Sequence, residues 1–282
     1  MHEKFINKYR FPEIENWCLF ESTETQKYWD YLCPTNRTIF WDSFDNTQGE
    51  KIQSLRVRVT NKEIINLPDF LYRMPNLLVL ELPLSLIKHL DNNSIPPQVK
   101  ILEVDGDGSS TFDKSFTSTT VQSFSTGMAK IKFTPSNFSS LEHLGIKLDS
   151  KNTMIKVIGE LKTLNSLEIA PYSDNRIFNE LENMKLKYLR ISGGRTDSIE
   201  GIERLTSLTD IWLQDLQKLT DLTPLSKLPE LKEITIAYCK NISITPLLSI
   251  PKLNKVTLFA CGNLTPSEDI PRLKEKLIEA RF

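Results

Sequence analysis

The apolar residues of this chain recur in a fixed pattern about every 22 positions. Six segments fit L-x-x-L-x-L, with Ile or Val replacing Leu in places, and they start 23, 22, 22, 23 and 22 residues apart. They are LEHLGI from Leu141, LNSLEI from Leu164, LKYLRI from Leu186, LTDIWL from Leu208, LKEITI from Leu231 and LNKVTL from Leu253. The alternation is typical of a short strand, which buries its apolar side only against a neighbouring copy. The pattern therefore predicts a solenoid of stacked repeats.

Weaker copies precede these six. They are IQSLRV from Ile52, LLVLEL from Leu77, VKILEV from Val99 and VQSFST from Val121. The copy at Val121 is poor because Thr126 stands where an apolar residue is expected. Ten copies at about 4.8 Å per strand predict a parallel sheet on the order of 45 Å along its stacking direction. Thr223 and Thr245 each precede a proline, which predicts helix N-caps and a short helical turn on the outer face.

The two ends of the chain do not carry the repeat. Residues 1–51 are rich in aromatics, and we predict an amino-terminal cap that covers the first strand of a solenoid at residues 52–265. A small functional module in this segment is the alternative. Residues 266–282 are predicted as a carboxy-terminal cap. There Ile270, Leu273 and Leu277 fit the apolar stripe of a helix, and a truncated eleventh strand is the other interpretation.

These repeats resemble the leucine-rich-repeat superfamily, whose pattern is L-x-x-L-x-L-x-x-N/C. The 22-residue length and the return segment T-P-L-x-x-L-P-x-L are most similar to the internalin-like class. The resemblance covers about residues 52–265. It implies an α/β solenoid with a parallel sheet on the concave side and short helical turns outside. The ninth position varies between copies, so no continuous asparagine ladder is expected; it holds Asp149, Tyr172, Gly194, Leu216, Cys239 and Cys261.

Composition and charge narrow the class of partner. The formal net charge is -1, which argues against broad electrostatic binding to nucleic acid or to a membrane surface. No segment has the length and apolarity of a membrane span, and the amino terminus lacks the apolar region of a secretory signal. We therefore expect a cytoplasmic protein. Cys239 and Cys261 are then predicted as two small buried thiols in equivalent positions, rather than a disulfide or half of a metal site.

Residues with catalytic or metal-binding chemistry are sparse. The only histidines are His2, His89 and His143, none with a metal-ligand or triad-like companion nearby, and His143 is expected to face solvent. The stretch DGDGSSTFD fails as a calcium loop, because Ser110 occupies the position of the turn glycine and Phe116 that of the bidentate glutamate. We predict no enzyme, no cofactor and no metal.

Strand alternation predicts where a partner would bind. The fourth and sixth positions of each copy point into the core, so the third, fifth and seventh point onto the concave sheet. Large aromatics on such a face, together with arginine, are typical of binding hot spots. The predicted partner-binding residues are Tyr188, Arg190, Trp212 and Phe259, surrounded by Glu168, Asp210, Glu233 and Lys255. The other interpretation is that Glu168 pairs with Arg190, which stacks on Trp212, as ordinary surface decoration.

A second, weaker patch joins Val79 and Ile101 with acidic residues that suit a basic partner; these are Glu81, Glu103 and Asp105. The leading hypothesis is a non-enzymatic protein-binding scaffold that acts through its concave sheet and is a monomer when free. One form of this function is a bacterial immunity protein that neutralises a toxin. The alternatives are a regulatory or targeting subunit of an enzyme, and an enzyme or ligand-binding module within residues 1–51.

Overall fold

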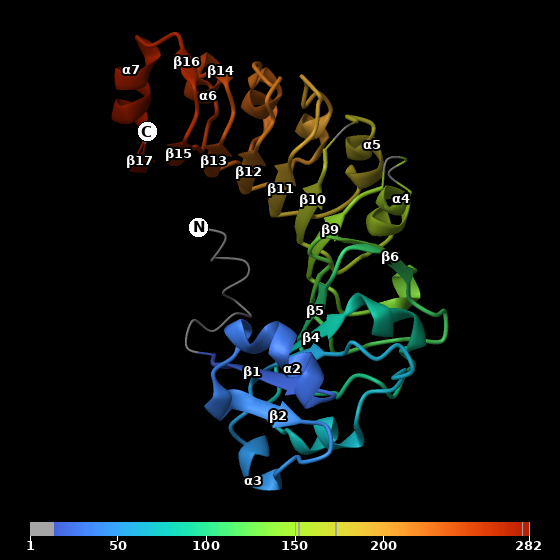
Figure 1. Ribbon diagram of the computed structural model, residues 1–282. Helices are drawn as coiled ribbons and strands as arrows, with labels where there is room; N and C mark the ends of the chain where they lie inside the picture. The colour runs from blue at the N-terminus through green and yellow to red at the C-terminus, as the bar shows by residue number, and fades with distance from the viewer. Residues whose placement is uncertain (1–13, 150, 152, 173, 278, 282) are drawn as a thin grey trace. The chain divides into compact units, whose positions relative to one another are not determined.

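The computed structural model describes residues 14–281 except 150, 152, 173 and 278. Thirteen strands form a sheet whose order largely follows the chain, and every strand pair with a defined register is parallel. Short helices connect the strands. The predicted α/β leucine-rich-repeat solenoid is confirmed by this topology. The chain divides into two compact units, Met1–Lys147 and Leu148–Phe282, which are described separately below (Figure 1).

The first unit contributes seven strands to the main sheet, and those after residue 52 follow the predicted period. The seven are β1 Asn16–Phe20, β2 Thr38–Phe40, β3 Ser54–Arg58, β4 Val79–Pro83, β5 Ile101–Asp105, β7 Ser123–Ser125 and β9 His143–Lys147. A separate two-stranded sheet pairs β6 Gly108–Thr111 with β8 Ala129–Lys132. The helices are α2 Thr23–Trp29 and α3 Asn46–Gly49, with short 3-10 turns at Asp30–Leu32, Thr35–Arg37, Asp69–Arg73, Leu84–His89 and Pro135–Asn137. Strands β3 to β9 of the main sheet each begin at the third position of a repeat copy.

In the second unit, each repeat copy again contains a strand that begins at its third position. Its strands in the main sheet are β10 Ser166–Ala170, β11 Tyr188–Ser192, β12 Asp210–Gln214, β13 Glu233–Ala237, β15 Lys255–Phe259 and β17 Glu279–Arg281. Strands β14 Asn241–Ser243 and β16 Asn263–Thr265 pair with each other. The helices are α4 Met154–Gly159, α5 Ile177–Leu181, α6 Thr245–Leu248 and α7 Asp269–Lys276, with 3-10 turns at Ile202–Arg204 and Thr223–Lys227. Within this unit, the helices lie together on one side of the sheet (Figure 1).

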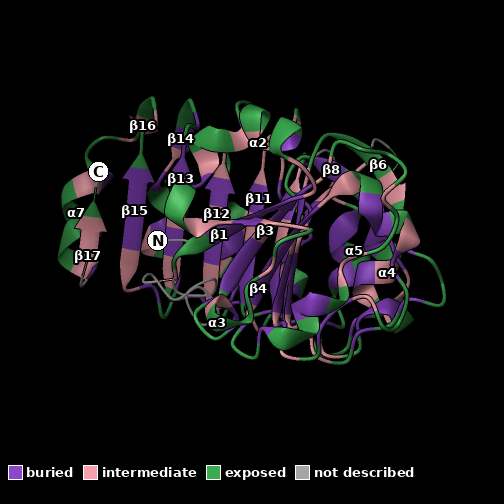
Figure 2. Ribbon diagram, turned by 60° about the horizontal axis from the view of Figure 1, so that its bottom comes forward, coloured by how far each residue is buried: buried purple, intermediate pink, exposed green. Residues whose placement is uncertain are grey.

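The core is built from the fourth and sixth positions of the copies. In β12, Ile211 and Leu213 are at most 2% exposed, whereas Trp212 between them is half-buried. Leu213 pairs in register with Ile191 and Ile236, so equivalent side chains form a continuous apolar row. Burial of each such side chain contributes about 1.5–3 kcal/mol. The strands accordingly carry long buried segments in Figure 2.

The poor copy at Val121 folds because its polar residue is satisfied. Thr126 occupies an apolar position and is fully buried, and its Oγ1 accepts a hydrogen bond from the backbone N–H of Lys147 at 3.1 Å. Phenylalanines fill the surrounding core; they are Phe112, Phe116, Phe124, Phe133 and Phe138, all buried. The rings of Phe124 and Phe138 stack with centroids 5.0 Å apart. Aromatic packing therefore replaces the leucine layer in this part of the first unit.

The segment before residue 52 enters the sheet instead of only covering its end. Strand β1 lies between β2 and β3. The carboxylate of Glu21 accepts hydrogen bonds from the backbone N–H groups of Thr60 and Asn61, at 2.7 and 3.0 Å, and this ties the turn after β1 to the turn after β3. Cys18 and Cys33 lie in one buried cluster with Phe20. The Cys33 thiol donates to the carbonyl oxygen of Arg37 at 2.9 Å, and the neighbouring Cys33 together with burial raises the pKa of the Cys18 thiol.

The carboxy-terminal segment contains both elements that its sequence suggests. Helix α7 buries Leu273, and β17 then pairs with β15. Lys276 Nζ donates to the carbonyl oxygens of Leu248 and Ile250, at 2.7 and 2.6 Å, which holds α7 against the end of α6. No helix in the described part of the chain is long and apolar enough to cross a membrane.

The prediction of threonine N-caps is wrong. Thr223 and Thr245 are the first residues of their helical turns, and neither turn has a side-chain cap. Their hydroxyls donate instead to carboxylates, Thr223 to Asp221 at 2.5 Å and Thr245 to Asp269 at 2.6 Å. At the first of these turns the Asp221 carboxylate also accepts from the backbone N–H of Thr223 at 2.8 Å, so Asp221 supplies the acceptor that the sequence assigned to a threonine hydroxyl.

Candidate functional site

All eight predicted partner-binding residues lie in strands β10 to β15 of the second unit. The register places Glu168, Arg190 and Trp212 side by side on three neighbouring strands. It likewise aligns Asp210, Glu233 and Lys255 on β12, β13 and β15. Phe259 lies at the end of β15, where Gln214 and Ala237 are its neighbours in the same row. At about 4.8 Å per strand, Gln214 and Phe259 are about 10 Å apart along this row.

Arg190 is held by three groups. Its Nη1 donates to Glu168 Oε2 at 3.3 Å, and its Nη2 donates to Gln214 Oε1 at 2.6 Å. The guanidinium carbon lies 4.4 Å from the centre of the Trp212 ring. The side chains of Arg190 and Glu168 are only 19% and 17% exposed. The contact of Glu168 with Arg190 and of Arg190 with Trp212, which the sequence offered as the alternative to a binding site, is therefore formed, and Arg190 covers one face of the Trp212 ring. The sequence prediction did not include Gln214, because its hydrogen bond to Arg190 depends on the neighbouring strand.

Tyr188 is buried, contrary to the expectation that it faces solvent. It is 5% exposed, and the third-position residues Ser123, His143 and Ser166 are buried as well. His143 therefore does not face solvent either. One in-register neighbour of each is a serine, Ser123 beside His143 and Ser166 beside Tyr188. Burial raises the pKa of the Tyr188 phenol, and the Glu168 carboxylate adds to that rise.

An exposed aromatic pair forms the far end of this surface. Phe259 is 56% exposed and Tyr238 is 48% exposed, and their rings meet edge to face with centroids 5.4 Å apart. The sequence prediction included Phe259 but missed Tyr238, which follows β13 at the eighth position of its copy. The backbone of Tyr238 is left-handed, with φ of 56°. The eighth residues of the neighbouring copies share this conformation; they are Gly193, Asp215 and Ala260.

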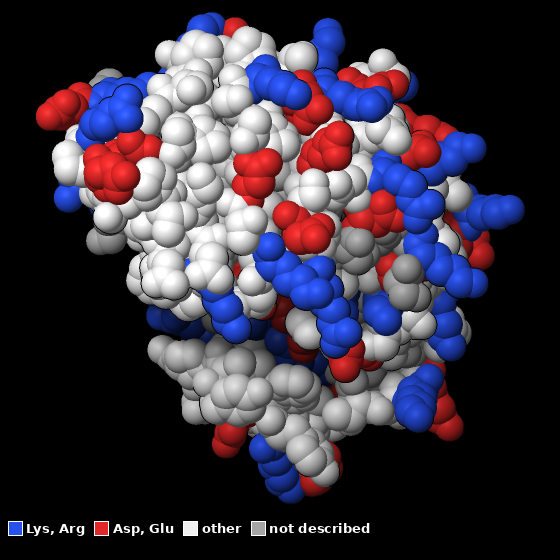
Figure 3. All heavy atoms as spheres, turned by 90° about the horizontal axis from the view of Figure 1, so that it is seen from above, with Lys and Arg blue, Asp and Glu red and all other residues white. Residues whose placement is uncertain are grey.

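Acidic and basic residues border the surface along one edge. Asp210 and Glu233 are half-buried and adjacent in register. Lys255 Nζ lies 2.7 Å from Glu279 Oε2 of β17. Over the molecular face shown in Figure 3, Lys and Arg are interspersed with Asp and Glu, without a broad region of one sign. That face therefore carries no large patch of one charge, in line with the net charge of -1.

The cysteines differ from the prediction in one respect. All four are free. Cys239 is 1% exposed, whereas Cys261 is not fully buried, because it lies one copy nearer the end of the stack. Burial raises the pKa of the Cys239 thiol to about 11. In the part of the chain that the structure describes, no three His, Cys, Asp or Glu side chains are grouped to hold a metal ion.

The architecture and the repeat together define a leucine-rich-repeat fold, as the sequence predicts. Among solved structures, the chain is similar to a TLR13–ssRNA13 complex, with 15% identity, a TM-score of 0.53, and coverage of 85% of this chain and 37% of that chain. This likeness concerns the fold alone. It is also similar to an internalin from Listeria monocytogenes, with 16% identity, a TM-score of 0.49, and coverage of 84% and 69%. No family model matches, and the comparison with curated proteins found no match.

Proposed function

We propose that the protein is a non-enzymatic scaffold that binds another protein through the sheet face of its second unit. The observation that carries this proposal is the exposed Tyr238–Phe259 pair, which lies on the same face of the sheet as the Arg190–Trp212 contact, in the neighbouring row of side chains. Two large rings exposed together have no evident folding role, and Trp, Tyr and Arg are the residues that dominate binding energy in protein interfaces.

The surface has the composition of a protein interface. Aromatic groups stand at Trp212 on β12 and at Phe259 on β15, with the small residues Thr235 and Ala237 of β13 between them, and charged residues such as Asp210 and Glu233 form a polar edge. An apolar centre with a polar rim is typical of protein-binding surfaces. Arg190 is already held by Glu168, so a partner meets a preorganised Trp212 and loses little side-chain entropy on binding.

The partner is identified by cross-linking and affinity purification from the source cell, followed by titration calorimetry with the purified proteins. Trp212→Ala and Phe259→Ala should each weaken binding; for Trp212 we expect at least about 2 kcal/mol, some thirtyfold. Tyr72→Ala, which changes an aromatic that is 46% exposed in the first unit, is the matched control and should bind as the wild type does. Equal binding by all variants would contradict the proposed surface.

The effect of binding on the partner's activity distinguishes an immunity protein from a targeting subunit. A toxin whose activity is lost on binding supports an immunity protein, and an enzyme that stays active supports a targeting subunit. The alternative of a functional module in residues 1–51 is tested by point variants, because deletion of that segment would remove β1 from its place beside β3. Loss of binding through changes there, with Trp212→Ala binding normally, would favour that alternative.

A further inference from the structure

Two aspartate–glycine pairs follow each other in the stretch DGDGSSTFD, which the sequence excludes as a calcium loop. They are Asp105–Gly106 and Asp107–Gly108. An aspartate before a glycine can isomerise, because the backbone nitrogen of the glycine attacks the side-chain carboxyl carbon and no Cβ hinders the approach. The rate depends on how close the two groups lie and on what else holds the carboxyl group. The structure holds the two carboxyl groups of this stretch differently.

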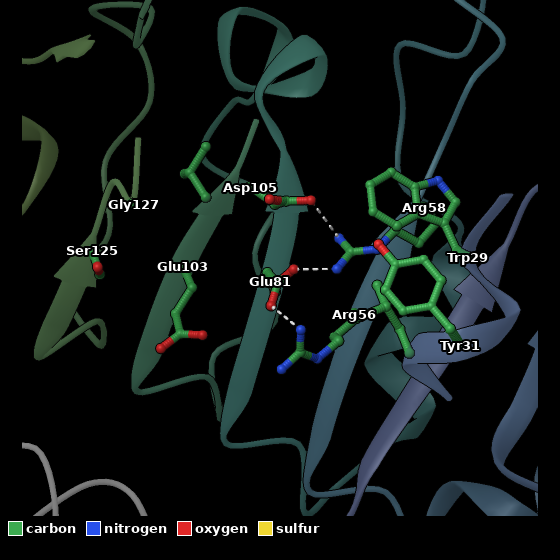
Figure 4. Close-up of a pocket in the computed structure, with 11 residues that line it drawn as sticks. Trp29, Tyr31, Arg56, Arg58, Glu81, Glu103, Asp105, Ser125 and Gly127 are labelled. Atoms are coloured by element: carbon green, nitrogen blue, oxygen red, sulfur yellow. Dashed lines mark hydrogen bonds and ion pairs between the residues drawn. The ribbon is translucent and has the colours of Figure 1, made fainter. Parts of the chain in front are cut away.

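The first of them is engaged in an ion pair. Asp105 ends β5 and lines a polar pocket of about 370 Å³ in the first unit (Figure 4). Its Oδ2 lies 3.4 Å from Nη1 of Arg58, whose side chain is only 3% exposed. Arg58 also pairs with Glu81, and the ring of Trp29 covers its guanidinium at 4.9 Å from the ring centre. Arg58 is therefore fixed, and it holds the carboxylate of Asp105.

The pocket contains the acidic residues of the weaker patch suggested by the sequence; they are Glu81, Glu103 and Asp105. Val79 and Ile101, which we expected beside them on the surface, are buried. Asp107, two residues further along the chain, lies outside the pocket lining. The two neighbouring aspartates therefore differ in their surroundings.

The second carboxyl group lies beside the amide that attacks it in isomerisation. The side chain of Asp107 is 86% exposed, against 43% for Asp105. Its Oδ1 accepts a hydrogen bond from the backbone N–H of Gly108 at 2.9 Å. Lys147 Nζ is 3.9 Å from the same oxygen, which is longer than a hydrogen bond. The backbone of Gly108 has φ of +115°, a conformation that glycine adopts without strain.

We propose that Asp107 is a site of spontaneous backbone isomerisation, and that the fold protects Asp105 from the same reaction. The nitrogen of Gly108 bonds to Cγ of Asp107. The amide proton and the hydroxyl of the protonated carboxyl group leave as water, and a cyclic succinimide remains. Water then adds to one of the two ring carbonyls and breaks its bond to nitrogen. When the backbone carbonyl is the one released, the product is isoaspartate, and no reactant other than water takes part.

The product lengthens the chain just before β6. In isoaspartate the main chain runs through the side chain, which adds one carbon ahead of Gly108. Gly108 begins β6 and pairs in register with Ala129 of β8. Because parallel pairing needs evenly spaced donors and acceptors, the added carbon shifts β6 against β8. The modification lies in the first unit and does not depend on the surface proposed for the second.

The test incubates the full-length protein in water enriched in the heavy isotope of oxygen and follows both positions by peptide mapping. Electron-transfer fragmentation distinguishes isoaspartate from aspartate at each position, and incorporation of the isotope reports hydrolysis of the succinimide. In the folded protein, we expect isoaspartate to form at position 107 at least about tenfold faster than at position 105.

The unfolded chain is the matched control, because both aspartates precede glycine and both lose their contacts. In about 6 M guanidinium chloride the two rates should agree within about threefold. Asp107→Glu keeps the charge but places the carboxyl group one carbon further from the backbone nitrogen. This variant should lose the signal at position 107 and keep the slow rate at position 105, and circular dichroism establishes that it is folded.

Three results overturn the proposal. The first is an equal rate at the two positions in the folded protein. The second is a difference that persists in guanidinium chloride, which would assign it to sequence and not to structure. The third is isoaspartate at position 107 only after unfolding, which would mean that the fold protects this position as well.

Discussion

Neighbouring residues of one strand lie in different surroundings, one in the core and one on the proposed binding surface. Leu213 is fully buried in the apolar row, and the adjacent Trp212 lies half-buried on the sheet face beside Arg190. Leu213→Ala should lower the free energy of unfolding by roughly 2–5 kcal/mol because it leaves a cavity. Trp212→Ala should cost about 1 kcal/mol through loss of the cation–π contact. Urea denaturation of both variants measures this order, and the reverse order would mean that Trp212 belongs to the core.

The two equivalent cysteines should differ in reactivity. Thiol reagents attack the thiolate, and the pKa of Cys239 is raised to about 11 by burial, so Cys239 should react slowly at about pH 8. Cys261 is partly exposed and should be labelled at least about tenfold faster. Peptide mapping by mass spectrometry after timed labelling distinguishes them, and denaturation should make both react. Similar labelling rates in the native protein would refute the difference in burial.

At the residue scale, the sequence predicts which face of the sheet a side chain lies on better than it predicts how exposed that side chain is. Alternation correctly places Leu213 inside and Trp212 outside. It does not predict that Tyr188 and His143 are buried, because exposure depends on the tertiary surroundings of a strand and not on its own alternation. Tyr238 was missed for a related reason: the repeat sets its position, and only its left-handed backbone directs the ring toward Phe259.

Among the elements, the contact between the turns after β1 and β3 should be sensitive to acid. Burial by itself would raise the pKa of Glu21, but hydrogen bonds from Thr25, Thr60 and Asn61 outweigh it and hold that pKa below its usual range. Because the pKa is lowered in the folded protein, the stabilisation is complete above the ordinary glutamate pKa of 4.5 and is lost as pH falls through the lower, folded value.

The test compares Glu21→Gln with the wild type between about pH 7 and pH 3. The variant should lose about 1 kcal/mol of stability at neutral pH and show a smaller decline on acidification. Glu50→Gln, a change at an exposed carboxylate, serves as the control. If the wild type and Glu21→Gln declined in parallel, Glu21 would not link these two turns.

The period of the repeat predicts where strands start, since each copy from Ile52 to Leu253 contains a strand that begins at its third position. It predicts nothing about residues without the repeat. The position of β1 between β2 and β3, and the contact of Trp29 with Arg58, join segments whose register no period defines. The pocket of the first unit was therefore only partly visible in the sequence, as its three acidic residues.

For the whole molecule, the stacking of copies predicts that damage remains local. Each copy of a solenoid contacts mainly its neighbours, so stability is close to a sum of repeat and nearest-neighbour contributions. Leu213→Ala should reduce hydrogen-exchange protection in β11 and β13 by at least about tenfold more than in β4 and β5. Hydrogen exchange read by mass spectrometry gives this comparison. A uniform loss of protection would show that the chain opens as one cooperative unit.

The left-handed backbone at Tyr238 places an exposed ring of the proposed binding surface at a position that is unfavourable for folding. A non-glycine residue there costs on the order of 1 kcal/mol, and the exposed ring recovers little of it through burial. Tyr238→Gly should therefore be as stable as the wild type or more stable in urea, yet bind the partner less tightly. A marked loss of stability would mean that the ring is needed for folding. Every copy from Gly193 to Ala260 has the same left-handed position, so the proposed surface allows one side chain per copy to be exchanged while the core stays unchanged.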